Sequence, residues 1–215
     1  MKRIIIHLIV AILSIIYLSS LSTRAINTAY AFWYAPNILA YGAVVFLILF
    51  NLKNKPIQNN DSIKMFCIVL TSLLLPNLTP YIGSLYTIYK NEPINILRNS
   101  AILINFFSML FYVYAVYSLG RGLTVLPEAH ILRTGGVYSI SRHPLYLTYI
   151  LWYITQNLIY QSWMVLLLSA VQIALILYRA KCEEKVLSSV FPDYTAYKNN
   201  VMWLGWRRKV NTACK

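Results

Sequence analysis

Long apolar runs with almost no charge constrain the fold of this chain more than any other feature of its sequence. Several windows contain about 18 or more nearly uncharged residues, which is enough for a helix to cross a hydrocarbon core of about 30 Å. Six spans are expected, with the approximate bounds 4–22, 29–50, 65–89, 100–118, 144–160 and 162–178. The sequence therefore predicts an all-α integral membrane protein with about six transmembrane helices.

The composition agrees with this fold class. The 215 residues are 59% hydrophobic and 12% charged, whereas soluble domains contain roughly 25% charged residues. The whole chain, 1–215, is therefore expected to form a single membrane domain. Pro76, Pro80 and Gly83 should kink the third span, since proline is tolerated inside membrane helices. The last two spans are joined by little more than Gln161, which predicts a tight helical hairpin.

Basic residues indicate the orientation of the chain. With the N-terminus in the cytoplasm, sixteen of the 19 Lys and Arg residues fall on the cytoplasmic side, and Arg24, Lys90 and Arg98 fall on the other. This positive-inside bias and the even number of spans place both termini in the cytoplasm. The first span is expected to be retained, although Lys2 and Arg3 before an apolar run also resemble a signal peptide.

Charge and cysteine content exclude two other classes of protein. The net charge of +13 does not indicate nucleic-acid binding, because the basic residues are spread over loops that are expected to face anionic lipid at the cytoplasmic surface. Cys67, Cys182 and Cys214 have no metal-ligand spacing and imply no disulfide framework. Neither a nucleic acid nor a metal is therefore an expected partner.

Polar residues that could do chemistry concentrate in two segments, both expected to be cytoplasmic. They are residues 119–146, LGRGLTVLPEAHILRTGGVYSISRHPLY, and residues 177–201, LYRAKCEEKVLSSVFPDYTAYKNNV. Two of the three histidines and four of the six acidic residues fall in these segments. Because the short hairpin joins the spans between them, the two segments are expected to be neighbours in space. Their proximity indicates a site.

The first segment has the features of a turn followed by a helix start. Gly135 and Gly136 permit a positive φ or a close backbone approach. Pro144 fits the first helical position, and the unpaired N–H groups of a helix start can bind an acceptor such as a carboxylate. Tyr146 lies three residues after His143 and shares its helical face. The alternative is an ordinary loop and helix start with basic residues at the lipid headgroups.

The second segment places a base and an acid one turn apart. Arg179 and Glu183 are spaced i,i+4 and share a face where the last span leaves the membrane. The alternative is a snorkelling arginine with a surface ion pair. Against it, the acid follows the base, and Glu183 and Glu184 put two like charges near the negative pole of the helix. A carboxylate at this position is more easily explained if it accepts hydrogen bonds from the hydroxyls of a ligand.

Together the two segments resemble the isoprenylcysteine carboxyl methyltransferase family and the related phospholipid methyltransferases. The resemblance rests on HILRTGGVYSISRHPLYL, residues 130–147, and on RAKCEEKVLSSVFPDYTAYKNNV, residues 179–201, and it covers about the last 100 residues. The family usually has a glycine two residues after the tyrosine of R-H-P-x-Y, where this chain has Thr148. This departure bears on helix packing more than on the chemistry.

The resemblance implies membrane helices with a cytoplasm-facing pocket for S-adenosylmethionine, built from the C-terminal half of the chain. Residues 1–118 would be N-terminal transmembrane helices, and residues 119–215 a methyltransferase-like catalytic region. By match to the motif, Arg179 would hold the carboxylate of the substrate, and Arg179 and Glu183 would be the catalytic residues. The same match implies cofactor contacts from His130, Ile131, Leu132, Arg133, Tyr138, His143, Pro144, Leu145, Tyr146 and Glu183.

The expected reaction is methyl transfer to a lipophilic acceptor that enters from the bilayer, such as the carboxylate of a prenylcysteine-like substrate. The methyl group must sit about 3–3.5 Å from the nucleophile. A carboxylate is already ionised near pH 7 and needs positioning rather than a base, which the fork of an arginine provides bidentately. A phospholipid amine would instead have to lose a proton, and His130 and Tyr138 are the candidates to accept it.

Two further hypotheses about the function of this chain stay open. The C-terminal region is also similar to that of membrane sterol or enone reductases, which would bind NADPH. A degenerate relative that serves as a membrane interaction protein would bind neither cofactor, although Arg179, Glu183 and His143 are all intact. The first four spans carry no motif that names the acceptor.

Overall fold

The computed structural model describes residues 96–122 and 129–204, apart from the side chain of Arg121, together with single residues between positions 8 and 85. Apart from Ile57, these single residues are helical, and they cluster at 8–19, 38–49 and 65–85, inside the first three expected spans. The ends of those spans and the expected kink at Pro76, Pro80 and Gly83 lie outside the described residues.

All the regular elements in the continuously described part of the chain are helices. They are α4 (Ile96–Leu119), η1 (Gly120–Gly122), η2 (Gly136–Ser139), α5 (Pro144–Tyr160), α6 (Trp163–Val190) and α7 (Tyr194–Asn200). Ser141 and Met202 form an isolated parallel β-bridge, and the described residues include no β-strand. The predicted all-α class is therefore confirmed for this part, while the number of six spans and the cofactor pocket stay predictions.

Within the part of the chain that the structure describes, two helices are long and apolar enough to cross a membrane, namely α4 with 24 residues and α6 with 28. The expected bounds 144–160 agree with α5, whose 17 residues extend about 26 Å. The last expected span, 162–178, lies within α6, which continues as a helix beyond the apolar run to Val190. Hydropathy marks where the apolar run stops, whereas the residues that follow Arg179 are good helix formers and prolong the helix.

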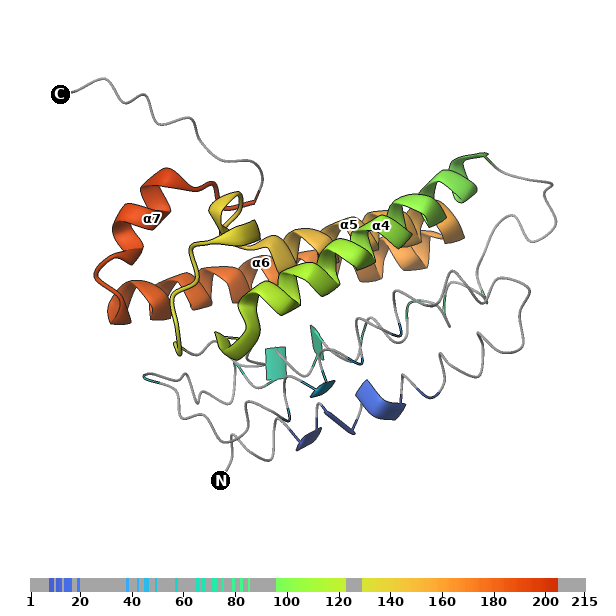
Figure 1. Ribbon diagram of the computed structural model, residues 1–215. Coiled ribbons are helices and arrows are strands. Elements are labelled where there is room, and N and C mark those ends of the chain that lie inside the picture. The colour runs from blue at the N-terminus through green and yellow to red at the C-terminus, as the bar shows by residue number, and fades with distance from the viewer. Residues whose placement is uncertain are drawn as a thin grey trace, which may run out of the picture.

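Helices α4, α5 and α6 lie side by side and share one core (Figure 1). The core cluster consists of Met109, Tyr112, Val116, Trp152, Tyr153 and Ile176. Polar side chains inside this bundle bond across helices: Asn105 Nδ2 donates to Thr155 Oγ1 at 3.1 Å, and Asn157 Nδ2 donates to Ser169 Oγ at 2.8 Å. Because an unpaired polar group in an apolar interior is costly, these bonds favour a single register of the three helices.

Thr148, the residue that departs from the family pattern, fits the contact between α4 and α5. It is completely buried, and its Oγ1 donates to the carbonyl of Leu145 at 2.7 Å. Its own carbonyl accepts from Ser108 Oγ on α4 at 3.5 Å. The hydroxyl is thus satisfied within α5, and the two helices pack without the glycine.

The expected hairpin of the last two spans is confirmed. Helix α5 is capped by Gln161, whose backbone is left-handed with φ 47°, and Ser162 precedes the first residue of α6. This two-residue connection reverses the chain, so the start of α5 and the C-terminal third of α6 lie at the same end of the bundle (Figure 1). Helix α7 and the segment 129–143 lie at that end as well.

Gly135, which precedes η2, and Gly136, its first residue, differ in conformation, which allows a matched test. Gly136 has φ +61°, whereas Gly135 is extended with φ −96° and has open space around the position of a Cβ. An alanine at Gly136 meets no close atom, so its cost comes from the left-handed backbone. We expect Gly136→Ala to lower the unfolding free energy by about 1 kcal/mol and Gly135→Ala to leave it nearly unchanged.

Thermal unfolding of the two variants in detergent measures this difference. A lower melting temperature for Gly136→Ala alone is the expected result. Equal melting temperatures for the two variants would contradict the assigned turn.

Candidate functional site

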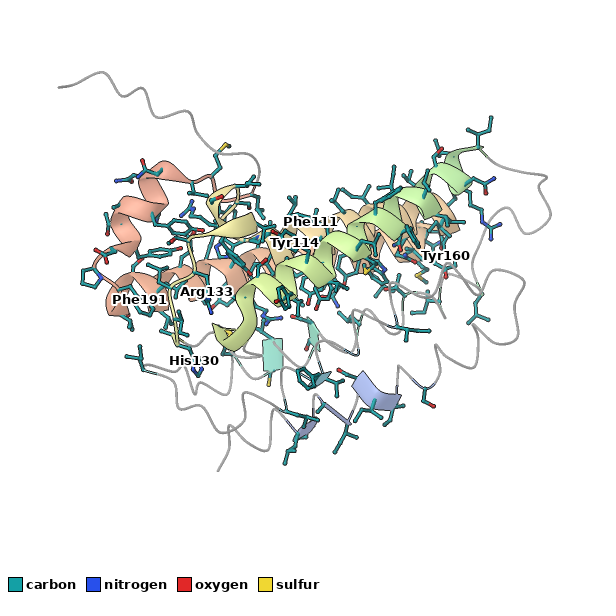
Figure 2. All side chains as sticks on the ribbon, in the orientation of Figure 1. Phe111, Tyr114, His130, Arg133, Tyr160 and Phe191 are labelled. Atoms are coloured by element: carbon teal, nitrogen blue, oxygen red, sulfur yellow. The ribbon has the colours of Figure 1, made fainter. Side chains whose placement is uncertain are left out.

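The two polar segments meet at the end of the bundle where α5 begins. Figure 2 shows His130 and Arg133 on the segment at this end, with Phe191 nearby and Tyr160 at the opposite end. Three parts of the chain build the site: the loop that ends at His143, the first turn of α5, and the polar third of α6. The short α7 lies over the loop (Figure 1).

A hydrogen bond joins the two motif segments directly. Tyr146 Oη on α5 donates to Glu183 Oε2 on α6 at 2.9 Å, across 37 residues of sequence. The guanidinium carbon of Arg179 lies 5.9 Å from the centroid of the Tyr146 ring, within reach of a cation–π interaction. The i,i+4 spacing on α6 thus brings Arg179 and Glu183 to the same tyrosine, as their shared face predicted.

His143 is buried between aromatic rings and a carboxylate. Its side chain is 4% exposed, and its ring centroid lies 5.3 Å from that of Tyr146 and 6.1 Å from that of Trp203. Its Nε2 lies 3.3 Å from Glu184 Oε1. The expected shared face of His143 and Tyr146 is therefore confirmed, and the histidine also contacts the second glutamate of the pair.

Glu184 is the centre of a charged cluster. It lies in the polar third of α6, beyond the apolar run, with 13% of its side chain exposed. Arg142 Nη1 lies 2.6 Å from its Oε1, and Lys198 Nζ from α7 lies 3.7 Å from its Oε2. Burial opposes ionisation of Glu184, but the hydrogen bond from His143 and the charge of Arg142 outweigh it, so the pKa of Glu184 lies below its ordinary value.

Tyr138 is fixed in the loop by packing and by its backbone. It is buried beside Ala115, Val137 and Leu145, and its carbonyl accepts a 2.6 Å hydrogen bond from Tyr197 Oη on α7. Burial, and then the negative charge of Glu183, raise the pKa of Tyr138 well above its ordinary value. Tyr138 is therefore a poor acceptor for the proton of an amine at neutral pH.

The start of α5 offers backbone donors without a side-chain cap. Pro144 is its first residue, and the side chain of the N-cap residue, His143, makes no capping hydrogen bond. The first backbone hydrogen bond of α5 runs from Leu147 N to the carbonyl of His143. The N–H groups of Leu145 and Tyr146 precede this bond and have no backbone acceptor within the helix. Such groups suit an anionic acceptor.

The predicted site residues do not all come together. The structure brings Tyr138, His143, Pro144, Leu145, Tyr146 and Glu183 into one neighbourhood. By contrast, the side chains of Ile131 and Arg133 are exposed and those of His130 and Leu132 are partly buried, on a segment without regular secondary structure. Cofactor contacts stay predictions for all ten residues.

Four further residues hold the site in place and were missed in the sequence: Arg142, Glu184, Tyr197 and Lys198. Arg142 lies beside His143 in the motif, and Glu184 was noted only as a like charge next to Glu183. An excess of basic residues around that acidic pair was the available signal. That excess of basic residues could not show which side chains contact one another, because they come from three different parts of the chain. Among the described residues no group of three or more His, Cys, Asp or Glu side chains could hold a metal.

The comparisons with known proteins agree with the resemblance. Residues 97–194 match the family model of phospholipid methyltransferases. The matched range is somewhat less than half of the chain and extends from α4 to the first residue of α7, so it contains both R-H-P-x-Y and the Arg179–Glu184 segment. No curated protein matches the chain. The match indicates a membrane methyltransferase and does not show which acceptor is methylated.

The low pKa of Glu184 predicts a pH dependence of stability. Its ionised form is stabilised by folding, so this contribution is present above the ordinary value of 4.5 and is lost as the pH falls below it through the folded pKa. The groups that face Glu184 are Arg142 and His143 from the loop, Lys198 and Tyr194 from α7, and its neighbour Glu183.

The measurement is the melting temperature in detergent between about pH 5 and 3 for the native chain and for Glu184→Gln. We expect the native chain to lose more stability over this range than the variant. If the melting temperatures of the two proteins fell in parallel with pH, these partners would not stabilise the ionised form of Glu184.

Proposed function

We propose that this chain is an S-adenosylmethionine-dependent membrane methyltransferase that acts on a lipophilic acceptor from the bilayer. The observation that carries the proposal is the hydrogen bond from Tyr146 to Glu183, because it joins the two halves of the motif into one site. The match of residues 97–194 to phospholipid methyltransferases supports the same reaction class.

The residues at the start of α5 fit S-adenosylmethionine. Glu183 presents a carboxylate that can accept hydrogen bonds from the two hydroxyls of a ribose, and Tyr146 fixes its orientation. The uncapped N–H groups of α5 suit the carboxylate of the amino-acid part. When bound, this cofactor would supply an electrophilic methyl group. The chain would then have to orient the acceptor and exclude water.

Arg179 is the residue that we assign to the acceptor. It lies where the apolar part of α6 ends, one turn before Glu183, with its guanidinium over the Tyr146 ring. A guanidinium in this position can hold a carboxylate through two parallel hydrogen bonds. A prenylcysteine-like carboxylate is therefore the preferred substrate.

The second candidate substrate is a phospholipid amine. The family description favours it, since residues 97–194 match phospholipid methyltransferases. His130 or solvent would have to accept the proton of this amine. A reductase that uses NADPH remains the competing enzyme class, and a ligand-binding comparison separates it from both.

We further propose that this end of the bundle faces the cytoplasm, together with both termini. The side chains of Arg133, Lys181, Lys185 and Lys198 are exposed around the site. Basic side chains in such a ring would contact anionic headgroups and hold the site at the membrane surface.

The proposed cofactor assignment predicts a selective effect of Glu183. Saturating S-adenosylhomocysteine should raise the melting temperature of the native chain, because it binds only the folded state, and NADPH should not. Glu183→Gln removes a charged acceptor and should weaken binding by roughly tenfold or more.

The matched control is Asp193→Asn, which makes the same change on an exposed side chain that caps nothing. It should bind like the native chain. A shift with NADPH alone would replace the methyltransferase by a reductase, and equal affinities of the two variants would remove Glu183 from the cofactor site.

The acceptor assignment predicts a different effect for Arg179. Arg179→Lys keeps the charge but loses the two-point grip on a carboxylate, so turnover should fall by roughly tenfold or more while cofactor affinity stays the same. Single-turnover methyl transfer to a prenylcysteine analogue measures the rate. Lys181→Arg, two residues along the same helix and exposed, is the control and should be fully active. Full activity of Arg179→Lys would favour the phospholipid amine.

A further inference from the structure

The adjacent glutamates of α6 have different partners. Glu183 accepts a hydrogen bond from Tyr146 in the first turn of α5, whereas Glu184 contacts Arg142, His143 and Lys198. Neighbouring residues on a helix point about 100° apart, so the two carboxylates face different parts of the chain. Glu183 is directed to α5, and Glu184 is directed to the loop and α7.

We propose that Glu184 is the positioning residue of this site, and that it acts on the cofactor through His143. The proposal deepens the proposed function and depends on it. An ionised carboxylate can only accept, so Nε2 of His143 must donate the proton between the two groups. In the neutral ring this leaves the lone pair on Nδ1. Glu184 therefore fixes both the orientation of His143 and the tautomer that it presents.

The loop that carries His143 is held from the other side as well. Arg142 N donates to the carbonyl of Met202 at 3.0 Å, and Ser141 Oγ donates to the carbonyl of Trp203 at 3.3 Å. The Trp203 ring packs edge-on against the imidazole of His143. These contacts fix the backbone of the loop, while Glu184 supplies the acceptor that fixes the side chains.

Glu184 also connects its own helix, α6, with the loop and with α7, both of which place basic side chains next to it. The side chain of Arg142 is 10% exposed and that of His143 is 4% exposed. Neither side chain can therefore exchange its contact with the carboxylate for a contact with water unless it moves. Loss of the carboxylate charge would leave a buried guanidinium beside the imidazole. The expected consequence is a displaced His143, which packs on Tyr146 and thereby on the proposed cofactor site.

A double-mutant cycle tests this positioning role with S-adenosylhomocysteine as the probe. Glu184→Gln should weaken binding by about tenfold, because the neutral amide can donate as well as accept and no longer fixes the tautomer. In a His143→Ala background the same substitution should have little further effect, since residues that act through one another are not additive. Asp193→Asn is the matched control and should bind like the native chain.

Each outcome of the cycle supports or contradicts either the positioning role of Glu184 or the proposed function. Native affinity in Glu184→Gln, or an equal loss with and without His143, would overturn the positioning role. Absence of binding by the native chain would instead overturn the proposed function. If Glu184→Gln does not fold, Glu184→Asp keeps the charge with a shorter reach and goes through the same cycle. Nitrogen NMR of labelled histidine gives an independent check: protonation of His143 at Nδ1 alone in the native chain would also contradict the proposal.

Discussion

The two-residue connection between α5 and α6 brings the two motif segments together at one end of the bundle. Gln161 turns the backbone through a left-handed conformation and Ser162 starts the next helix, so the start of α5 returns to the polar end of α6. Only this reversal lets the Tyr146 hydroxyl reach Glu183, 37 residues later. A longer connection would allow other registers, and the polar bonds across the bundle would then have to select one of them.

The charges at this end of the bundle follow from the cost of placing them near an apolar interior. Glu184 is balanced by Arg142, His143 and Lys198, and its ionised form is stabilised by them. Glu183 has a hydroxyl partner and remains suited to hydrogen bonds from a ligand. One glutamate thus secures the loop and the other serves the proposed chemistry. The reversed order of Arg179 and Glu183, unfavourable for a simple helix pair, is consistent with separate roles for the two side chains.

Much of the local structure could be predicted from the sequence, because local rules determine it. The bounds of α5 follow from hydropathy and Pro144, and the left-handed turn falls on Gly136, one of the two adjacent glycines. The length of α6 could not be predicted from hydropathy, since its last turns are polar and helical by propensity. The cluster around Glu184 was missed for another reason: its partners come from the loop and from α7, and only the packed fold brings them together.

The proposed reaction of this chain is methyl transfer to a lipophilic acceptor. Membranes that contain the native chain, incubated with S-adenosylmethionine labelled in its methyl group, test it most directly. The account predicts label in the lipid extract that base releases as volatile methanol, the behaviour of a methyl ester, and much less of this label in membranes with Glu183→Gln at subsaturating cofactor. Label that resists base would indicate an N-methylated lipid and contradict the carboxylate acceptor. Lipid label no greater than in membranes that lack the chain would contradict the methyltransferase function itself.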